Sequence, residues 1–198
     1  MSRIEPLTEE PQDELYRQLL RHAEEKGTPD ARMVKVYGRT ELGAQWLAFC
    51  HEAFYGGILP HRLKELIRIR MSVAEECGYC SSLRSKQAQE EGLTEDVVME
   101  MLDLDASTRL TEQEKAAVRY ADRYRRDDVD ADDAFEELRK HFSDEEIIEL
   151  GVLCGTLDGG GKFAKSLQVL SWSEACEIRA TLTEMRAAQA EQEPAAVG

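Results

Sequence analysis

The sequence predicts an all-α fold, a bundle of many helices. Two segments, Thr111-Glu112-Gln113-Glu114 and Ser143-Asp144-Glu145-Glu146, fit the capping box, in which a hydroxyl and a later carboxylate satisfy unpaired N–H groups at a helix start. Glycines at 27, 56–57, 92 and 159–161 stand where helices are expected to end. Continuous strand-like alternation is hard to find. We therefore expect helices throughout the folded part.

The helices are expected at regular intervals within one domain of residues 12–186. Residues 1–11 are polar and carry two prolines, and residues 187–198 contain few bulky apolar side chains. We interpret both ends as flexible tails. The expected helices are 13–25, 40–55, 61–75, 78–91, 94–103, 112–126, 131–141, 144–157 and 162–186, the last of them broken or continuous.

The segment Leu63–Ala74 is expected to be the central helix, because it carries apolar residues on two sides. Glu65 lies on the second of these apolar stripes, with Ile69 and Val73. A carboxylate there should be less solvated than one at the surface, so we expect its pKa to tend upward.

A weak internal repeat relates Leu63-Lys64-Glu65-Leu66-Ile67 to Ile147-Ile148-Glu149-Leu150-Gly151, at an offset of 84 residues. The second copy lacks the cysteines of the first. Two unrelated helices that share a Glu-Leu pair explain the match equally well.

The net charge of −15 over 198 residues argues against nucleic acid and against an anionic membrane surface as partners. The N-terminus has no apolar core for a signal peptide, and no segment is apolar enough to span a bilayer. We expect a cytoplasmic protein. There, five cysteines do not indicate a disulfide framework, and the three isolated ones, Cys50, Cys154 and Cys176, are expected to be small buried residues.

The strongest chemical signal is Cys77-Gly78-Tyr79-Cys80, a pair of cysteines with the spacing of a redox dithiol. Glu65, twelve residues before Cys77, is the candidate base. Twelve residues of straight helix would separate carboxylate and sulfur by about 18 Å, so the helix must break before or at Cys77, and Gly78 is a plausible place. Arg84 can favour a thiolate electrostatically but cannot shuttle protons.

Other interpretations of this pair stay open. The cysteines are inert core residues, or they bind zinc together with Cys50 and His51, or they are the vestige of an ancestral redox site. Apart from the zinc alternative, we find no metal or cofactor motif, since Gly159–Phe163 only faintly resembles a phosphate loop. His51 and His61 are further candidates for a base near the thiols.

At these residues the chain resembles the carboxymuconolactone decarboxylase and alkylhydroperoxidase-D (AhpD)-like family. The resemblance runs from Leu59 to Arg68, through the CxxC to Gly92-Leu93-Thr94-Glu95, and again over Phe142–Leu150. It implies an AhpD-like helical bundle with two related halves, assembled as a homo-oligomer.

In the redox-active branch, the resemblance implies that Cys80 attacks a peroxide and Cys77 resolves it, assisted by Glu65. That branch has a histidine four residues after the CxxC, where this chain has Arg84. The departure leaves peroxidase efficiency in question. The decarboxylase branch typically lacks the CxxC.

Two functions follow as hypotheses. The first is a thiol-dependent peroxidase or disulfide reductase that acts on a small peroxide and is regenerated by a thiol or protein reductant. The second is a non-redox helical oligomer, decarboxylase-like or binding a small acid, in which Arg68, Arg70 and Arg84 form a carboxylate-binding cluster.

Overall fold

The computed structural model describes residues 2–9, 14–25, 30–77, 80–81, 83–128 and 132–169, and these hold nine labelled helices and no strand. The predicted all-α fold is confirmed. The helices are α1 (Glu14–Glu25), α2 (Asp30–Tyr37), α3 (Glu41–Tyr55), α4 (His61–Ala74), α6 (Lys86–Glu90), α7 (Glu95–Glu100), α8 (Glu112–Arg125), α9 (Asp132–Arg139) and α10 (Asp144–Leu167).

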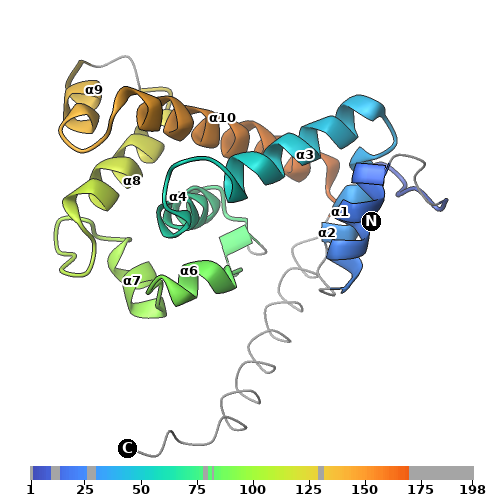
Figure 1. Cartoon of the computed structure of the whole chain (residues 1–198), viewed down its shortest axis with the longest axis horizontal. Coiled ribbons are helices and arrows are strands. Elements are labelled where there is room, and N and C mark those ends of the chain that lie inside the picture. Colours follow the sequence, from blue (N-terminus) through green and yellow to red (C-terminus); the bar gives the residue numbers. More distant parts are fainter. Residues whose placement is uncertain are drawn as a thin grey trace, which may run out of the picture.

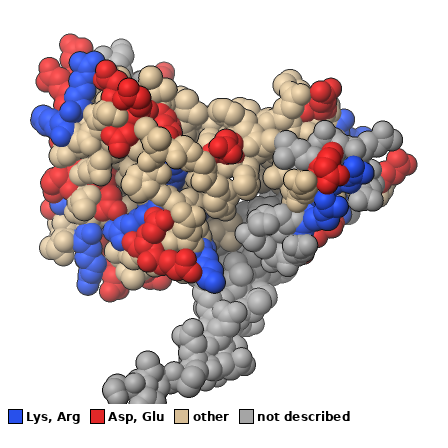
Figure 2. All heavy atoms as spheres, viewed as in Figure 1, with Lys and Arg blue, Asp and Glu red and all other residues tan. Residues whose placement is uncertain are grey.

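The helices surround α4, which packs against α8, α10, α6 and α3 (Figure 1). Helices α3 and α10 lie side by side along one edge of the molecule. Helices α6 to α9 form the larger lobe around α4, whereas α1 and α2 pack on each other at the opposite end (Figure 1). The space-filling view shows acidic and basic side chains interspersed over the larger lobe (Figure 2).

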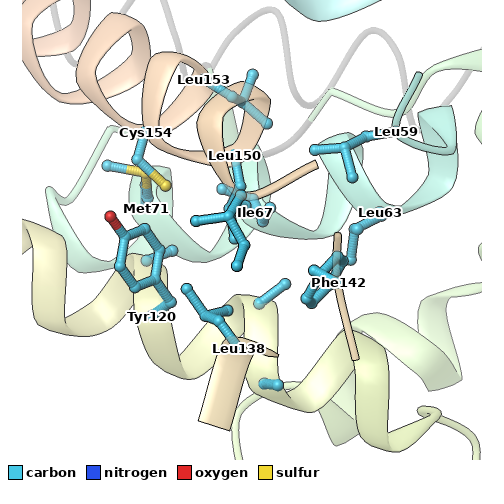
Figure 3. Packing of buried hydrophobic residues seen from close by; sticks show 14 residues of the cluster. Leu59, Leu63, Ile67, Met71, Tyr120, Leu138, Phe142, Leu150, Leu153 and Cys154 are labelled. Atoms are coloured by element: carbon cyan, nitrogen blue, oxygen red, sulfur yellow. The ribbon is translucent and has the colours of Figure 1, made fainter. Parts of the chain in front are cut away.

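Two apolar clusters cover opposite sides of α4, which confirms that this helix is central. Ile67 lies in the middle of the first cluster, between α8 and α10 (Figure 3). Leu66 and Ile69 belong to the second cluster, which α6, α7 and α8 complete. The second apolar stripe was predicted to include Val73, but the Val73 side chain is exposed.

Both predicted capping boxes are present. The Thr111 hydroxyl accepts the N–H of Glu114, whose carboxylate accepts the N–H of Thr111, and Ser143 and Glu146 do the same for α10. Each box satisfies two N–H groups that would otherwise be unpaired. These local signals therefore fix where α8 and α10 begin.

The expected helix end at Gly159–Gly161 is wrong, because α10 continues to Leu167. Tertiary contacts explain why glycine is placed here without stopping the helix. A Cβ at Gly161 would lie 2.7 Å from Oε2 of Glu75, and one at Gly160 would lie 3.8 Å from Trp46. Of these glycines, only Gly161 has a neighbour closer than ordinary van der Waals contact, so the close approach that glycine allows is that of the Glu75 side chain at the end of α4, and α10 continues despite the low helix propensity of glycine.

Three further expectations change. The single helix expected over 78–91 is replaced by helical residues at 80–81, non-helical residues 83–85, and α6. Helix α2 was not predicted. Within the N-terminal tail expected over residues 1–11, the N–H groups of Arg3 and Leu7 donate to the carbonyls of Leu167 and Lys35. Residues 170–198, including Cys176, lie outside the described part.

Candidate functional site around the dithiol

The helix break predicted before or at Cys77 is found at Glu76, whereas Gly78, the suggested place, lies outside the described residues. Glu76 has a left-handed φ of 57°, its N–H donates to the Val73 carbonyl, and the N–H of Cys77 donates to the Ser72 carbonyl at 2.9 Å. These two bonds form a Schellman ending. The turn reverses the chain and brings Cys77 back against the last turn of α4.

The Cys77 sulfur is stabilised as a thiolate. A hydrogen bond from the Cys80 side chain and one from the Cys80 N–H, at 3.4 Å from N to Sγ, lower the pKa of Cys77 to about 6. Burial and the Glu75 carboxylate act against this, while the Arg68 guanidinium supports it. Of the two sulfurs, Cys77 is therefore the one that its surroundings favour as a thiolate, with Cys80 as the hydrogen-bond donor.

Glu65 is fully buried, with 1% of its surface exposed, and its carboxylate is held on three sides. Two parallel hydrogen bonds of 2.8 Å join it to Nε and Nη2 of Arg68, and the Ser85 N–H donates to it at 2.8 Å. Burial alone would raise its pKa, but Arg68 and Ser85 outweigh burial and lower it. The expectation of a raised pKa is wrong, since it did not include these partners.

Arg68 joins Glu65 to the dithiol segment. Its Nη1 donates to the Cys80 carbonyl and its Nη2 donates to the Leu83 carbonyl at 2.8 Å. Its pKa is raised, because the interaction with Glu65 and the nearby Cys80 and Tyr55 groups outweigh burial. The pair therefore positions the chain after Cys80 and places a fixed positive charge near both sulfurs.

Arg84 binds Glu95 and backbone carbonyls of the segment after the CxxC. Its Nε and Nη2 bind the two carboxylate oxygens of Glu95 at 2.9 and 3.0 Å, and its Nη1 donates to the carbonyls of Ser81 and Leu83 at 2.7 Å. These bonds tie the segment after the CxxC to α7. Arg84 acts here as a structural clamp.

His61 is the buried histidine of the site, with 5% of its surface exposed. Its Nδ1 lies 3.3 Å from the Phe54 carbonyl, which can only accept, so Nδ1 carries the proton. Its Nε2 then accepts from the Ser85 hydroxyl at 2.7 Å. Tyr55 stacks on the imidazole, with ring centroids 5.1 Å apart. Ser85 therefore links the two residues His61 and Glu65, because its hydroxyl contacts His61 and its N–H donates to Glu65.

His51, the other histidine considered, is exposed on α3 and has its ring 4.8 Å from that of Tyr55. Among the described residues, Cys50 and Cys154 are the other cysteines, and neither shares the environment of the dithiol. Burial raises the pKa of half-buried Cys50 to about 11 and that of buried Cys154 to about 12. Within the described ranges, no group of three or more His, Cys, Asp or Glu side chains could hold a metal ion.

The carboxylate-binding cluster expected from Arg68, Arg70 and Arg84 does not form. Arg70 binds Asp122 through Nη2 at 2.7 Å, Arg68 binds Glu65, and Arg84 binds Glu95. Each guanidinium already has a carboxylate within the protein.

Sequence reasoning missed Ser85 as a site residue and gave Arg68 the wrong role. The spacing of Glu65 and Arg68, three apart on one helix, was a signal for their ion pair. The contact of Ser85 with His61 depends on the path of the chain after the dithiol, and no local pattern encodes it.

The sequence from residue 40 to residue 123 matches the carboxymuconolactone decarboxylase family. Two uncharacterized proteins of Mycobacterium tuberculosis are 38% identical over 87 residues, which cover 43% of this chain and 31% of each relative. The chain thus spans about a third of the length of the curated relatives it matches.

Solved structures extend the likeness. A protein of unknown function from Agrobacterium tumefaciens, suggested to be the antioxidant defence protein AhpD, is 32% identical, with a TM-score of 0.57 over 65% of this chain and 88% of the other. The debrominase Bmp8 is 20% identical, with a TM-score of 0.69 over 89% and 96%, and shows the fold alone. The chain belongs to the carboxymuconolactone decarboxylase family and has an AhpD-like fold.

No helix in the described residues is long and apolar enough to cross a membrane.

Proposed function

We propose that the chain is a thiol-dependent oxidoreductase that reduces a small peroxide with the Cys77–Cys80 dithiol. The observation that carries the proposal is the Cys77 sulfur held 3.4 Å from the Cys80 N–H, in a setting where hydrogen bonds from the Cys80 side chain and N–H lower the pKa of Cys77. A buried pair of inert cysteines would have raised pKa values, as Cys50 and Cys154 do.

The hydrogen bond between the sulfurs supplies a base for the first step. As the Cys80 sulfur attacks the peroxide O–O bond, its proton moves to the Cys77 thiolate. The attacked oxygen stays on Cys80 as a sulfenic acid, and the other oxygen leaves as an alkoxide that takes a proton from water. The Cys77 thiol then condenses with the sulfenic acid, which forms the disulfide and releases water.

Glu65 and Arg68 serve as positioning residues in this scheme. A carboxylate that already accepts three hydrogen bonds is a weak base, so we assign proton transfer to Cys77 rather than to Glu65. Arg68 holds the Cys80 carbonyl and adds a positive charge beside the thiolate.

The test is peroxide consumption with dithiothreitol as the reductant, measured for wild type, Cys80→Ser, Cys77→Ser and, as a control, Cys50→Ser. Cys80→Ser should abolish turnover. Cys77→Ser should stop disulfide formation and, because the base is lost, should slow but not prevent formation of the sulfenic acid that a dimedone probe detects at Cys80. Cys50→Ser should match wild type. Wild-type turnover in Cys80→Ser would overturn the proposal.

The cytoplasm fits this chemistry, since it maintains thiol reductants. A non-redox role in small-acid binding has less support, because the three arginines it requires are each paired with a carboxylate.

We also propose that the chain forms a homo-oligomer through α10. Ile148 is 68% exposed, and Val152, one helical turn later, is exposed beside it. Such an apolar stripe is typical of a subunit contact. Light scattering should report an oligomer for wild type and a smaller species for Ile148→Asp. A monomeric wild type would contradict the proposal.

A further inference from the structure

A cavity of about 290 Å³ lies where the C-terminal end of α4 meets α8 and α10, three helices that pack together (Figure 1). It is close to the lower size limit of small-molecule sites. Its lining consists of one alanine and five charged residues: Ala74, Glu75, Glu76, Arg125, Lys162 and Lys165.

Two oppositely charged side chains in this lining each have one buried atom with no hydrogen-bond partner among the described residues. Nε of Arg125 is buried without a hydrogen bond, and so is Oε1 of Glu75. The two groups interact electrostatically but form no ion pair with each other. An unpaired buried donor and an unpaired buried acceptor each carry a desolvation cost, which a ligand that bridges them would remove.

The other cations of the lining are already engaged. Lys162 binds Asp158 at 2.5 Å, and Lys165 donates to the Glu75 backbone carbonyl at 3.1 Å. Gly161 makes room for the Glu75 side chain, because a Cβ there would meet its Oε2 at 2.7 Å. Among the lining residues, the groups left for a ligand are therefore the Arg125 guanidinium at the end of α8 and the Glu75 carboxyl just after α4, with the unbonded Oδ1 of Asp158 interacting electrostatically with Glu75.

We propose that this cavity binds the α-amino-acid headgroup of a small thiol and presents that thiol to Cys77. The carboxylate of such a headgroup matches Arg125, and its ammonium matches Glu75. Glu75 stands two residues before Cys77, close enough for its charge to act on that sulfur. The inference rests on the dithiol chemistry proposed above and names its electron donor.

The reaction at this point is thiol–disulfide exchange. The thiolate of the bound thiol attacks the Cys77 sulfur of the Cys77–Cys80 disulfide, and Cys80 leaves as a thiolate near the positive charge of Arg68. A second molecule of the same thiol then attacks the mixed disulfide. The products are the protein dithiol and one small-molecule disulfide, so two electrons pass from two thiols to the protein.

The test uses full-length protein whose dithiol has been oxidised with diamide, and it measures the rate of reduction by four thiols. Cysteine carries both charges, cysteamine lacks the carboxylate, 3-mercaptopropionate lacks the ammonium, and dithiothreitol has neither. Each rate is divided by the rate of that thiol with a small free disulfide. We expect cysteine to exceed both single-charge analogues by roughly tenfold or more.

Two variants show which residue recognises the carboxylate of cysteine and which recognises its ammonium group. Arg125→Gln should remove the advantage of cysteine over cysteamine, and Glu75→Gln should remove its advantage over 3-mercaptopropionate, each compared with dithiothreitol in the same variant. Arg126→Gln, at the exposed neighbouring arginine, should behave as wild type. L-Serine, which has the headgroup without the thiol, should slow cysteine but not dithiothreitol.

Equal normalised rates for the three charged thiols would overturn the inference, and so would an advantage of cysteine that survives both Arg125→Gln and Glu75→Gln. Either outcome would mean that water, and not an amino-acid headgroup, bridges Arg125 and Glu75. Because diamide forms the disulfide, the outcome of this test does not depend on peroxide reduction. A failure of peroxide reduction would appear separately, in the peroxide-consumption assay described under the proposed function.

Discussion

Glu65→Gln tests whether the carboxylate of the site is an anchor or a base. The substitution keeps the shape of the side chain and an oxygen for the Ser85 N–H, but it removes the charge that faces Arg68. Breaking a buried ion pair in this way costs about 3–5 kcal/mol. We expect the lower end, about 3 kcal/mol, because Arg68 keeps 14% of its side chain exposed and two carbonyl partners.

The measurement is the free energy of unfolding in urea at pH 7, followed by circular dichroism, with a melting temperature expected to fall by about 6–12 °C. Glu95→Gln is the matched control. It removes the carboxylate from the Arg84 pair, but Glu95 is 63% exposed, so the loss should be about 0.5 kcal/mol or less. Equal losses for the two variants would refute the assignment of Glu65 as an anchor.

The pH dependence of this difference has a definite sign. The pKa of Glu65 is lower in the folded protein than its ordinary value of 4.5, so its contribution is complete above 4.5 and is lost as the pH falls through the folded pKa. The gap between wild type and Glu65→Gln should therefore be constant from pH 7 to 5 and narrow below about 4.5. A gap that widens on acidification would contradict the argument.

Three other substitutions test neighbouring features. Cys80→Ala removes a hydrogen bond from the Cys77 thiolate, so the alkylation rate against pH should show its pKa rising from about 6 toward 9.0; an unchanged profile would refute that bond. Glu76→Gly relieves a left-handed φ of 57° and should raise thermal stability by about 1 kcal/mol, while Glu76→Ala gives no gain. Lys64→Met leaves partly buried Glu149 without its buried cation and should cost about 3 kcal/mol in urea unfolding; a loss below about 1 kcal/mol would contradict this.

The parts of the fold that could be predicted are those that neighbouring residues encode. The capping boxes of α8 and α10 satisfy N–H groups within one helical turn, so the sequence alone locates both helix starts. The two apolar sides of α4 likewise follow from helical periodicity.

Predictions failed where contacts between distant segments decide the outcome. The glycines at 159–161 usually indicate a helix end, but here α10 continues through them, and Gly161 makes room for the Glu75 side chain. Glu65 was correctly expected to be buried. The direction of its pKa depended on Ser85, twenty residues away, and on the conformation of Arg68.

Arg84 determines how the site must handle protons. A guanidinium that clamps Glu95 cannot relay a proton, so in the scheme proposed above the Cys77 thiolate acts as the base. Peroxide reduction should then be lost on the acid side with a midpoint near pH 6, as Cys77 becomes protonated. Arg84→His should add a second ionisation near that of an ordinary histidine, about 6.5. If the wild-type profile already shows this second ionisation and His61→Gln removes it, His61 is the relay, acting through Ser85, and the dithiol alone is not sufficient.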